Sequence, residues 1–139
     1  MLLYEDRTDI RGAGMAANKK ILLIDDERVL HIMLRSVFAT HGIDVISAYT
    51  GEEGIERVIN EKPDMVILDV ILPTIKGREV CRRLKAMEVS ANIPVMFLTA
   101  KDSEDDIEAE MSLGAITHVN KPINSMALLR EIKKILGGG

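Results

Sequence analysis

The chain has a single cysteine among its 139 residues and no long apolar run. Because Cys81 cannot form an internal disulfide on its own, the sequence fits a reducing compartment. Every apolar stretch is too short to span a membrane. Residues 1–7 carry charges where a signal peptide would need an apolar stretch. The location expected from the sequence is therefore cytoplasmic.

The sequence also lacks an excess of positive charge. Its formal net charge is -4, and no basic stripe is present that could release counterions from a nucleic acid. A composition of 47% hydrophobic and 29% charged residues is that of an ordinary globular domain. A chain of this length can bury a proper core in one domain, so a single domain without a direct nucleic-acid partner is expected.

The two ends of the chain differ from the rest. Residues 1–18 show no sustained hydrophobic period, so we expect a flexible leader or a segment added for expression, with Met15 as an alternative start. Residues 137–139 are all glycine and indicate a flexible tail. One folded domain is predicted between these ends, over residues 19–136.

Five short apolar segments predict β-strands. The first, third and fourth are almost continuously apolar, which is typical of parallel strands that helices cover on both faces. The predicted strands are residues 20–25, 44–48, 65–69, 94–99 and 117–120.

Helical periods fill the gaps between these strands. Apolar residues repeat every three or four positions, as at Leu30, Leu34 and Val37, and this repeat gives a helix one apolar face. Thr50 and Glu53 match a capping box at a helix start. Five strands that alternate with five helices imply right-handed βαβ units. A chain this short fits a flavodoxin-like, doubly wound, five-stranded parallel sheet of order 2-1-3-4-5.

Polar residues follow the apolar segments at the point where each segment ends. Asp25 and Asp26 follow the first, Asp69 closes the third, Thr99 closes the fourth, and Lys121 follows the fifth. In an open parallel sheet, these carboxyl ends meet at the edge where ligands bind. We therefore expect three carboxylates, a hydroxyl and an ammonium group in one crevice.

The three carboxylates would repel one another, and the pKa of at least one of them would rise. A hard divalent cation, Mg²⁺ or in its place Mn²⁺, would relieve this repulsion and bind phosphate oxygens as well. An aspartate can act as a covalent nucleophile in phosphoryl transfer. Lys121 would supply a positive charge for a phosphoryl oxygen, and Thr99 would supply a hydroxyl donor.

At these residues the chain resembles the receiver domain (a CheY-like fold) of two-component response regulators, over roughly residues 19–136. The resemblance rests on Asp25-Asp26-Glu27, Asp69-Val70-Ile71-Leu72-Pro73 with Gly77, Thr99-Ala100-Lys101, and Gly114-Ala115 followed by Lys121-Pro122.

The resemblance implies a role for each residue of the crevice. Asp69 would accept a phosphoryl group from a histidine kinase or a histidine phosphotransfer protein. Asp26 would bind Mg²⁺ directly, Asp25 mostly through water, and the backbone carbonyl of Ile71 would be a further ligand. Thr99 would hydrogen-bond the phosphoryl group, and Lys121 would form an ion pair with it.

The same resemblance implies supporting features and an output. The Lys121-Pro122 peptide would be cis and Gly77 structural. Phosphorylation would draw Thr99 inward, let residue 118 turn into the vacated space, and reshape the surface of residues 102–136. Such a domain is a signalling phosphoacceptor rather than an enzyme. It is expected as a monomer or a phosphorylation-dependent dimer, with a downstream protein partner that the sequence does not identify.

Three positions depart from the family pattern. His118 stands where the family usually has tyrosine or phenylalanine. Histidine at this position resembles the pattern of single-domain regulators in phosphorelays; alternatively, His118 is only a solvent-facing strand residue. Lys76 replaces an acidic residue often found before the glycine. Neither Ile71 nor Lys101 supplies a base for water attack, which predicts slow loss of phosphate from Asp69.

Three other functions are alternatives for the same residues. A phosphatase of the haloacid-dehalogenase type needs a second aspartate two residues after the nucleophile, where this chain has Ile71. A flavodoxin-like cofactor carrier needs a phosphate loop rich in serine, threonine and glycine after the first strand, where this chain is acidic. A receiver used only as an unphosphorylated docking scaffold is disfavoured by the intact acidic set.

Several polar or reactive residues are expected to have structural roles. Cys81 is predicted to be a packed thiol. His31 and His41 share no metal-ligand spacing with it, so a zinc site is not expected. The acidic residues from Glu104 to Glu110 could form a partner-facing surface, but such a run is more often a solvated helix start.

Overall fold

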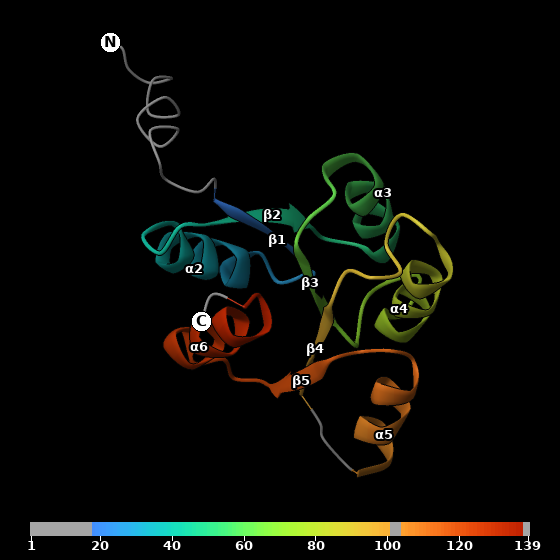
Figure 1. Cartoon of the computed structure of the whole chain (residues 1–139). Helices are drawn as coiled ribbons and strands as arrows, with labels where there is room; N and C mark the ends of the chain where they lie inside the picture. The colour runs from blue at the N-terminus through green and yellow to red at the C-terminus, as the bar shows by residue number, and fades with distance from the viewer. Residues whose placement is uncertain (1–17, 101–103, 138–139) are drawn as a thin grey trace.

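A computed structural model describes residues 18–100 and 104–137 (Figure 1). Within these residues five strands alternate with five helices, close to the predicted segments. The strands are β1 (Lys19–Ile24), β2 (Ile43–Ala48), β3 (Met65–Asp69), β4 (Val95–Thr99) and β5 (Thr117–Asn120). The helices are α2 (Arg28–Ala39), α3 (Gly51–Glu61), α4 (Gly77–Ala86), α5 (Glu104–Ser112) and α6 (Ser125–Ile135).

The strands form one parallel sheet in the order β2-β1-β3-β4-β5, as predicted from the sequence. The strand order reverses at β1, which lies between β2 and β3. Crevices at such a reversal are where doubly wound folds bind their ligands. The predicted leader lies outside the described residues except for Asn18, and so do the last two glycines of the tail.

The helices cover both faces of the sheet, with α2 and α6 on one side and α3, α4 and α5 on the other (Figure 1). Side chains alternate between the faces along each strand. Ile21 and Leu23 of β1 therefore join the core under α2 and α6, whereas Leu22 and Ile24 join the core under α3 and α4. Burial on both faces explains why β3 and β4, and β1 after Lys20, are apolar until the strands end.

Local signals in the sequence act as predicted at the helix ends. Thr50 Oγ1 accepts a hydrogen bond from the Glu53 backbone N–H at 3.1 Å, and Glu53 Oε1 accepts one from the Tyr49 N–H at 2.8 Å. Cys81 is buried, as predicted for a packed thiol, and burial raises the pKa of this thiol. No helix in the described part of the chain is long and apolar enough to cross a membrane.

The acidic stretch on α5 is not uniformly solvated, so that interpretation is wrong for Glu110. Glu110 is buried, and its Oε2 lies 3.7 Å from Arg78 Nη2 of α4. Arg78 also forms an ion pair with Asp106 at 3.0 Å. Burial raises the pKa of Glu110, although the charges of Arg78 and His118 oppose the rise. The sequence pattern missed this pairing because the two helices meet only in the folded state.

Candidate functional site

The sheet brings the polar strand ends to one edge. Asp69 is the last residue of β3 and Thr99 the last of β4, while Asp25 and Lys121 directly follow β1 and β5. Neighbouring strands are in register up to this edge, with Ile24 opposite Leu68. The side chains of Asp69 and Thr99 are buried. These residues therefore meet where the sequence predicts, around the β1–β3 boundary.

Three carboxylates gather at this edge. One oxygen each from Asp25, Asp26 and Asp69 can be chosen so that all three lie within 4.8 Å of one another. Asp25 is fully buried and Asp69 nearly so, whereas Asp26 is exposed. Backbone N–H groups fix the two buried carboxylates. Asp25 Oδ1 accepts from Glu27 N–H at 2.8 Å, and Asp69 Oδ1 accepts from Ile71 N–H at 3.1 Å.

Lys121 reaches into the cluster from the end of β5. Its Nζ lies 3.0 Å from Asp25 Oδ2, 3.3 Å from Asp69 Oδ2 and 3.0 Å from Glu27 Oε1. Burial alone would lower the pKa of Lys121, but its contacts with the carboxylates of Asp25, Glu27 and Asp69 hold it above the ordinary value. The Lys121-Pro122 peptide is cis, as the family resemblance implies.

The contact of Lys121 with Glu27 was not predicted. Glu27 is largely exposed and lies 94 positions away in the chain, so only the fold brings the two together. The one signal in the sequence is that Glu27 completes the acidic run Asp25-Asp26-Glu27.

The electrostatics of the cluster single out Asp69. Burial and the nearby charge of Asp25 raise the pKa of Asp69 to about 6, although Lys121 and the Ile71 N–H act in the opposite direction. This agrees with the expectation that carboxylate crowding raises the pKa of at least one member. Close to neutral pH, Asp69 is still mostly ionised and can act as a nucleophile.

The donor set fits a hard divalent cation. Asp25 Oδ2 is buried and has no hydrogen-bond partner among the described residues; its 3.0 Å contact with Lys121 is an ion pair without hydrogen-bond geometry. Carboxylate oxygens are the ligands that Mg²⁺ takes, together with water and phosphate oxygens. Asp25, Asp26 and Asp69 could therefore hold such an ion and relieve their mutual repulsion.

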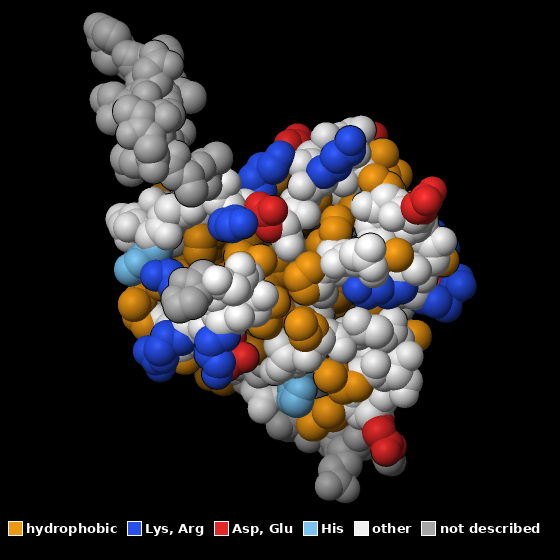
Figure 2. Space-filling model, viewed as in Figure 1, with side chains coloured by type: hydrophobic (Ala, Val, Ile, Leu, Met, Phe, Trp, Pro, Cys, Tyr) orange, Lys and Arg blue, Asp and Glu red, His pale blue; other side chains and the backbone are white. Residues whose placement is uncertain are grey.

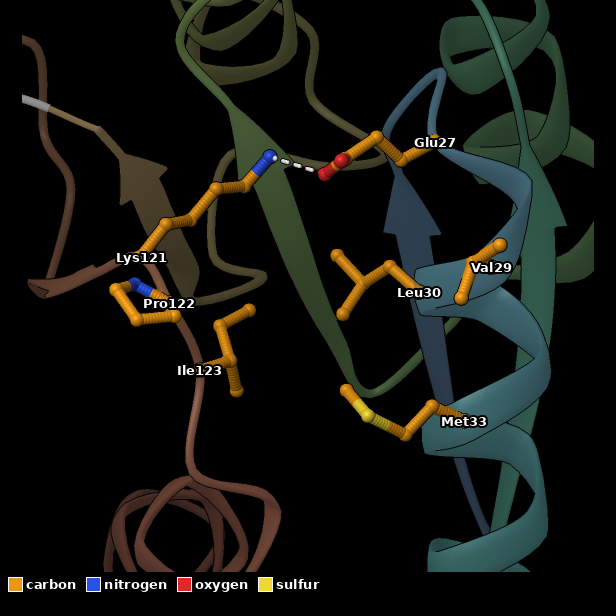
Figure 3. A pocket seen from close by; sticks show the side chains of 7 residues that line it. All are labelled: Glu27, Val29, Leu30, Met33, Lys121, Pro122 and Ile123. Carbon is orange, nitrogen blue, oxygen red and sulfur yellow. Dashed lines mark hydrogen bonds and ion pairs between the residues drawn. The ribbon is translucent and has the colours of Figure 1, made fainter.

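A largely apolar groove adjoins this cluster (Figure 3). Glu27 and Lys121 form its polar end, where the dashed line in Figure 3 joins them. Its other lining residues come from α2 and from the segment after β5: Val29, Leu30, Met33, Pro122 and Ile123. Val29 is 76% exposed. The approach to the cluster is thus lined by apolar surface.

Surface charge agrees with the composition. On the face shown in Figure 2, lysine and arginine side chains stand in separate groups between acidic and apolar ones rather than in one stripe.

The fold and the cluster define a class of protein, namely doubly wound α/β domains with an acidic, lysine-containing pocket at the point of strand reversal. Comparison with known protein families identifies the family within this class: the family model of the response regulator receiver domain matches residues 21–133. The chain therefore belongs to the receiver domain family of response regulators.

Individual relatives agree. The chain is 40% identical over 119 residues to the alkaline phosphatase synthesis transcriptional regulatory protein PhoP of Bacillus subtilis (strain 168), an alignment that covers 86% of this chain and 49% of PhoP. The chain thus spans about half the length of this curated relative.

Solved structures show the same fold. A two-component response regulator from Clostridium difficile superposes with a TM-score of 0.80 at 27% identity, covering 86% of this chain and 96% of the other. The BeF3-activated N-terminal receiver domain of RstA from Klebsiella pneumoniae gives a TM-score of 0.78 at 27% identity, covering 85% and 98%. The family accordingly identifies this chain as a receiver domain of a two-component response regulator.

Proposed function

We propose that Asp69 accepts a phosphoryl group from a phosphohistidine of a histidine kinase or phosphotransfer protein. The observation that supports this most strongly is the placement of Asp69: a buried carboxylate with a raised pKa, 3.3 Å from Lys121 Nζ and within reach of two further carboxylates. A single carboxylate at a strand end commonly has only a structural role, in a turn or a helix cap. This combination is what a phosphoryl acceptor needs.

In the proposed reaction an ionised Asp69 oxygen attacks the phosphorus, forming a P–O bond as the P–N bond to the imidazole breaks. The leaving nitrogen keeps the electron pair of that bond and takes up a proton. Lys121 Nζ, already beside Asp69 Oδ2, pairs with one phosphoryl oxygen, and the Thr99 hydroxyl donates to another. A bound Mg²⁺ would neutralise charge on the transferred group. Asp25, Asp26, Asp69 and the Ile71 carbonyl are the proposed ligands, and Mn²⁺ can replace Mg²⁺.

The apolar groove of Figure 3 supports a protein donor rather than a small one. A partner that brings an imidazole to Asp69 must cover the polar end of this groove. Glu27 and Lys121 line that end, and Lys121 also forms the ion pair with Asp69. Val29 and Met33 of α2 are then available to pack against an apolar helix of the donor. A cytoplasmic location fits this proposal, since a chain with a single cysteine forms no internal disulfide.

The proposed output is a change of the 102–136 surface through Thr99 and His118. Residues 102–103 lie outside the described part of the chain, whereas α5, β5 and α6 lie within it. His118 is half-buried on β5, so it is neither locked in the core nor fully in solvent. The proposed domain extends over residues 19–136.

Incubation with acetyl phosphate and Mg²⁺, followed by intact mass measurement and peptide mapping, tests the proposal. The expected result is one added phosphoryl group on Asp69, lost in Asp69→Asn and strongly reduced by EDTA. A phosphoryl group at another residue would contradict it.

The same preparation discriminates the phosphatase alternative, which the family assignment does not favour. A receiver stops near one phosphoryl group per chain. Continuous turnover of phosphate esters would instead indicate a haloacid-dehalogenase type of activity, although Ile71 stands where that enzyme needs its second aspartate.

A further inference from the structure

His31 of α2 lies directly behind the acidic cluster and is buried, with 1% of its surface exposed. Both of its ring nitrogens are engaged. Nε2 lies 2.7 Å from the backbone carbonyl oxygen of Asp25, and Nδ1 lies 2.7 Å from Ser47 Oγ of β2. No sequence motif connects this histidine with the site, because it shares no metal-ligand spacing with the other residues.

The direction of each hydrogen bond follows from the chemistry of the partners. A carbonyl oxygen can only accept, so Nε2 carries the hydrogen. With the hydrogen of the neutral ring on Nε2, Nδ1 accepts from the Ser47 hydroxyl. Ser47 Oγ in turn accepts from Arg35 Nη2. One directed chain therefore runs from Arg35 through Ser47 and His31 to Asp25.

Aromatic packing fixes the plane of the imidazole. The Tyr49 ring lies 4.5 Å from the His31 ring, centroid to centroid, at an interplanar angle of 45°. The guanidinium carbon of Arg28 lies 4.1 Å from the centroid of the Tyr49 ring. His31 can therefore neither rotate freely nor exchange its partners without disturbing the β2 side of the sheet.

The consequence falls on Asp25, whose other polar groups are also fixed. Its N–H donates to the Ala48 carbonyl at 3.1 Å, and its Oδ1 accepts from Glu27 N–H at 2.8 Å. With the carbonyl held by His31, only the buried Oδ2 is left without a hydrogen bond among the described residues. The restraints on the main chain of Asp25 thus decide where this oxygen stands relative to Asp26 and Asp69.

From this geometry we propose that His31 is a positioning residue: by holding the Asp25 carbonyl, it orients the Asp25 carboxylate for the divalent cation. The inference deepens the proposed function and rests on it. It adds a residue that touches neither metal nor phosphoryl group. Groups that orient ligands in this way commonly change metal affinity about 10- to 100-fold when they are lost.

The test is Mn²⁺ binding to the full chain, followed by electron paramagnetic resonance without any phosphodonor. His31→Leu removes the donor to Asp25 and is expected to weaken Mn²⁺ binding about tenfold or more. His31→Gln keeps a side-chain N–H and is expected to recover most of the affinity. Leu34→Ala is the matched control, because Leu34 is buried on the same helix but away from the cluster. It should lower stability without changing Mn²⁺ affinity.

A purely structural role predicts a different result. His31→Leu would then lose stability to urea like Leu34→Ala but bind Mn²⁺ as the wild type does, and the proposal would be overturned. If His31→Leu does not fold, Ser47→Ala takes its place. It removes the donor to Nδ1 and is expected to weaken Mn²⁺ binding about threefold, less than loss of the histidine itself. Unchanged binding in Ser47→Ala would overturn the proposal equally.

The wild type separates this inference from the proposed function. If the wild type neither binds Mn²⁺ nor takes up a phosphoryl group on Asp69, the proposed function fails. If the wild type does both and the His31 variants match it, only the role of His31 fails.

Discussion

Gly77 packs against the backbone carbonyl of Asp69 so closely that a Cβ at residue 77 would overlap the carbonyl oxygen. Its N–H also donates to the Val70 carbonyl at 2.9 Å. The first residue of α4 is therefore fixed to the end of β3, the strand that carries the proposed phosphoacceptor. Because the neighbouring atoms are backbone, a rotamer change cannot make room for a side chain.

Gly77→Ala is therefore expected to lower the free energy of unfolding by about 1–3 kcal/mol, as overpacking against an unyielding neighbour does. It should also slow phosphorylation of the folded fraction, because the displaced backbone is that of Asp69. Urea denaturation and intact mass after acetyl phosphate treatment measure the two effects. Gly51→Ala is the control, since the atoms nearest to its Cβ would be side-chain atoms of Ile75 and Val80, at 2.6 Å, rather than backbone. Equal phosphorylation rates in the two variants would contradict the prediction.

Asp69→Asn is expected to stabilise the metal-free protein at neutral pH. The folded state raises the pKa of Asp69 from 3.8 to about 6, so between these values it binds more protons than the unfolded state. Stability is therefore lost as pH rises through this window, about 3 kcal/mol in total at most. Asparagine removes that penalty. Urea denaturation in EDTA should show the advantage of Asp69→Asn at about pH 7.5 and little of it at about pH 4. An advantage that does not depend on pH would contradict this origin.

The strands and their order were predictable because the central strands are buried on both faces. Burial leaves β3 and β4, and β1 after Lys20, without polar side chains until the strand ends, and this gives a strong signal in the sequence. The same signal located Asp25, Asp69 and Thr99, since each is the first polar side chain after its apolar run.

The connections between these residues and their neighbours were not predictable. Lys121 meets Glu27, His31 meets the Asp25 carbonyl, and Arg78 meets Glu110 because separate elements pack together. A hydrophobic period fixes which face of a helix is buried, but it does not show which polar partner lies opposite. His31 and Glu110 illustrate the difference, because both are polar residues on buried positions.

The phosphorylated form is expected to lose phosphate slowly, with a half-life of minutes or longer in Mg²⁺. Ile71 lies two residues after Asp69 with 62% of its surface exposed, and its side chain can neither orient nor deprotonate a water. Ile71→Glu should shorten the half-life about tenfold, a small part of what a well-placed base supplies. Phosphate release after removal of acetyl phosphate measures both. Ile116→Glu, at a similarly exposed isoleucine just before β5, is the control. A wild-type half-life of seconds without a phosphatase would refute the prediction.

His118 is expected to carry the response to phosphorylation toward α5 and α6. It is half-buried on β5, and its charge acts on the buried Glu110, whose Oε1 has no hydrogen-bond partner among the described residues. A ring that turns inward would thus have a carboxylate to meet. Phosphorylation should change the hydrogen exchange of backbone amides in α5, β5 and α6, and His118→Ala should reduce this change. His41→Ala, at an exposed histidine after α2, should leave it intact. If His118→Ala and the wild type respond equally, His118 is a solvent-facing strand residue and not part of the switch.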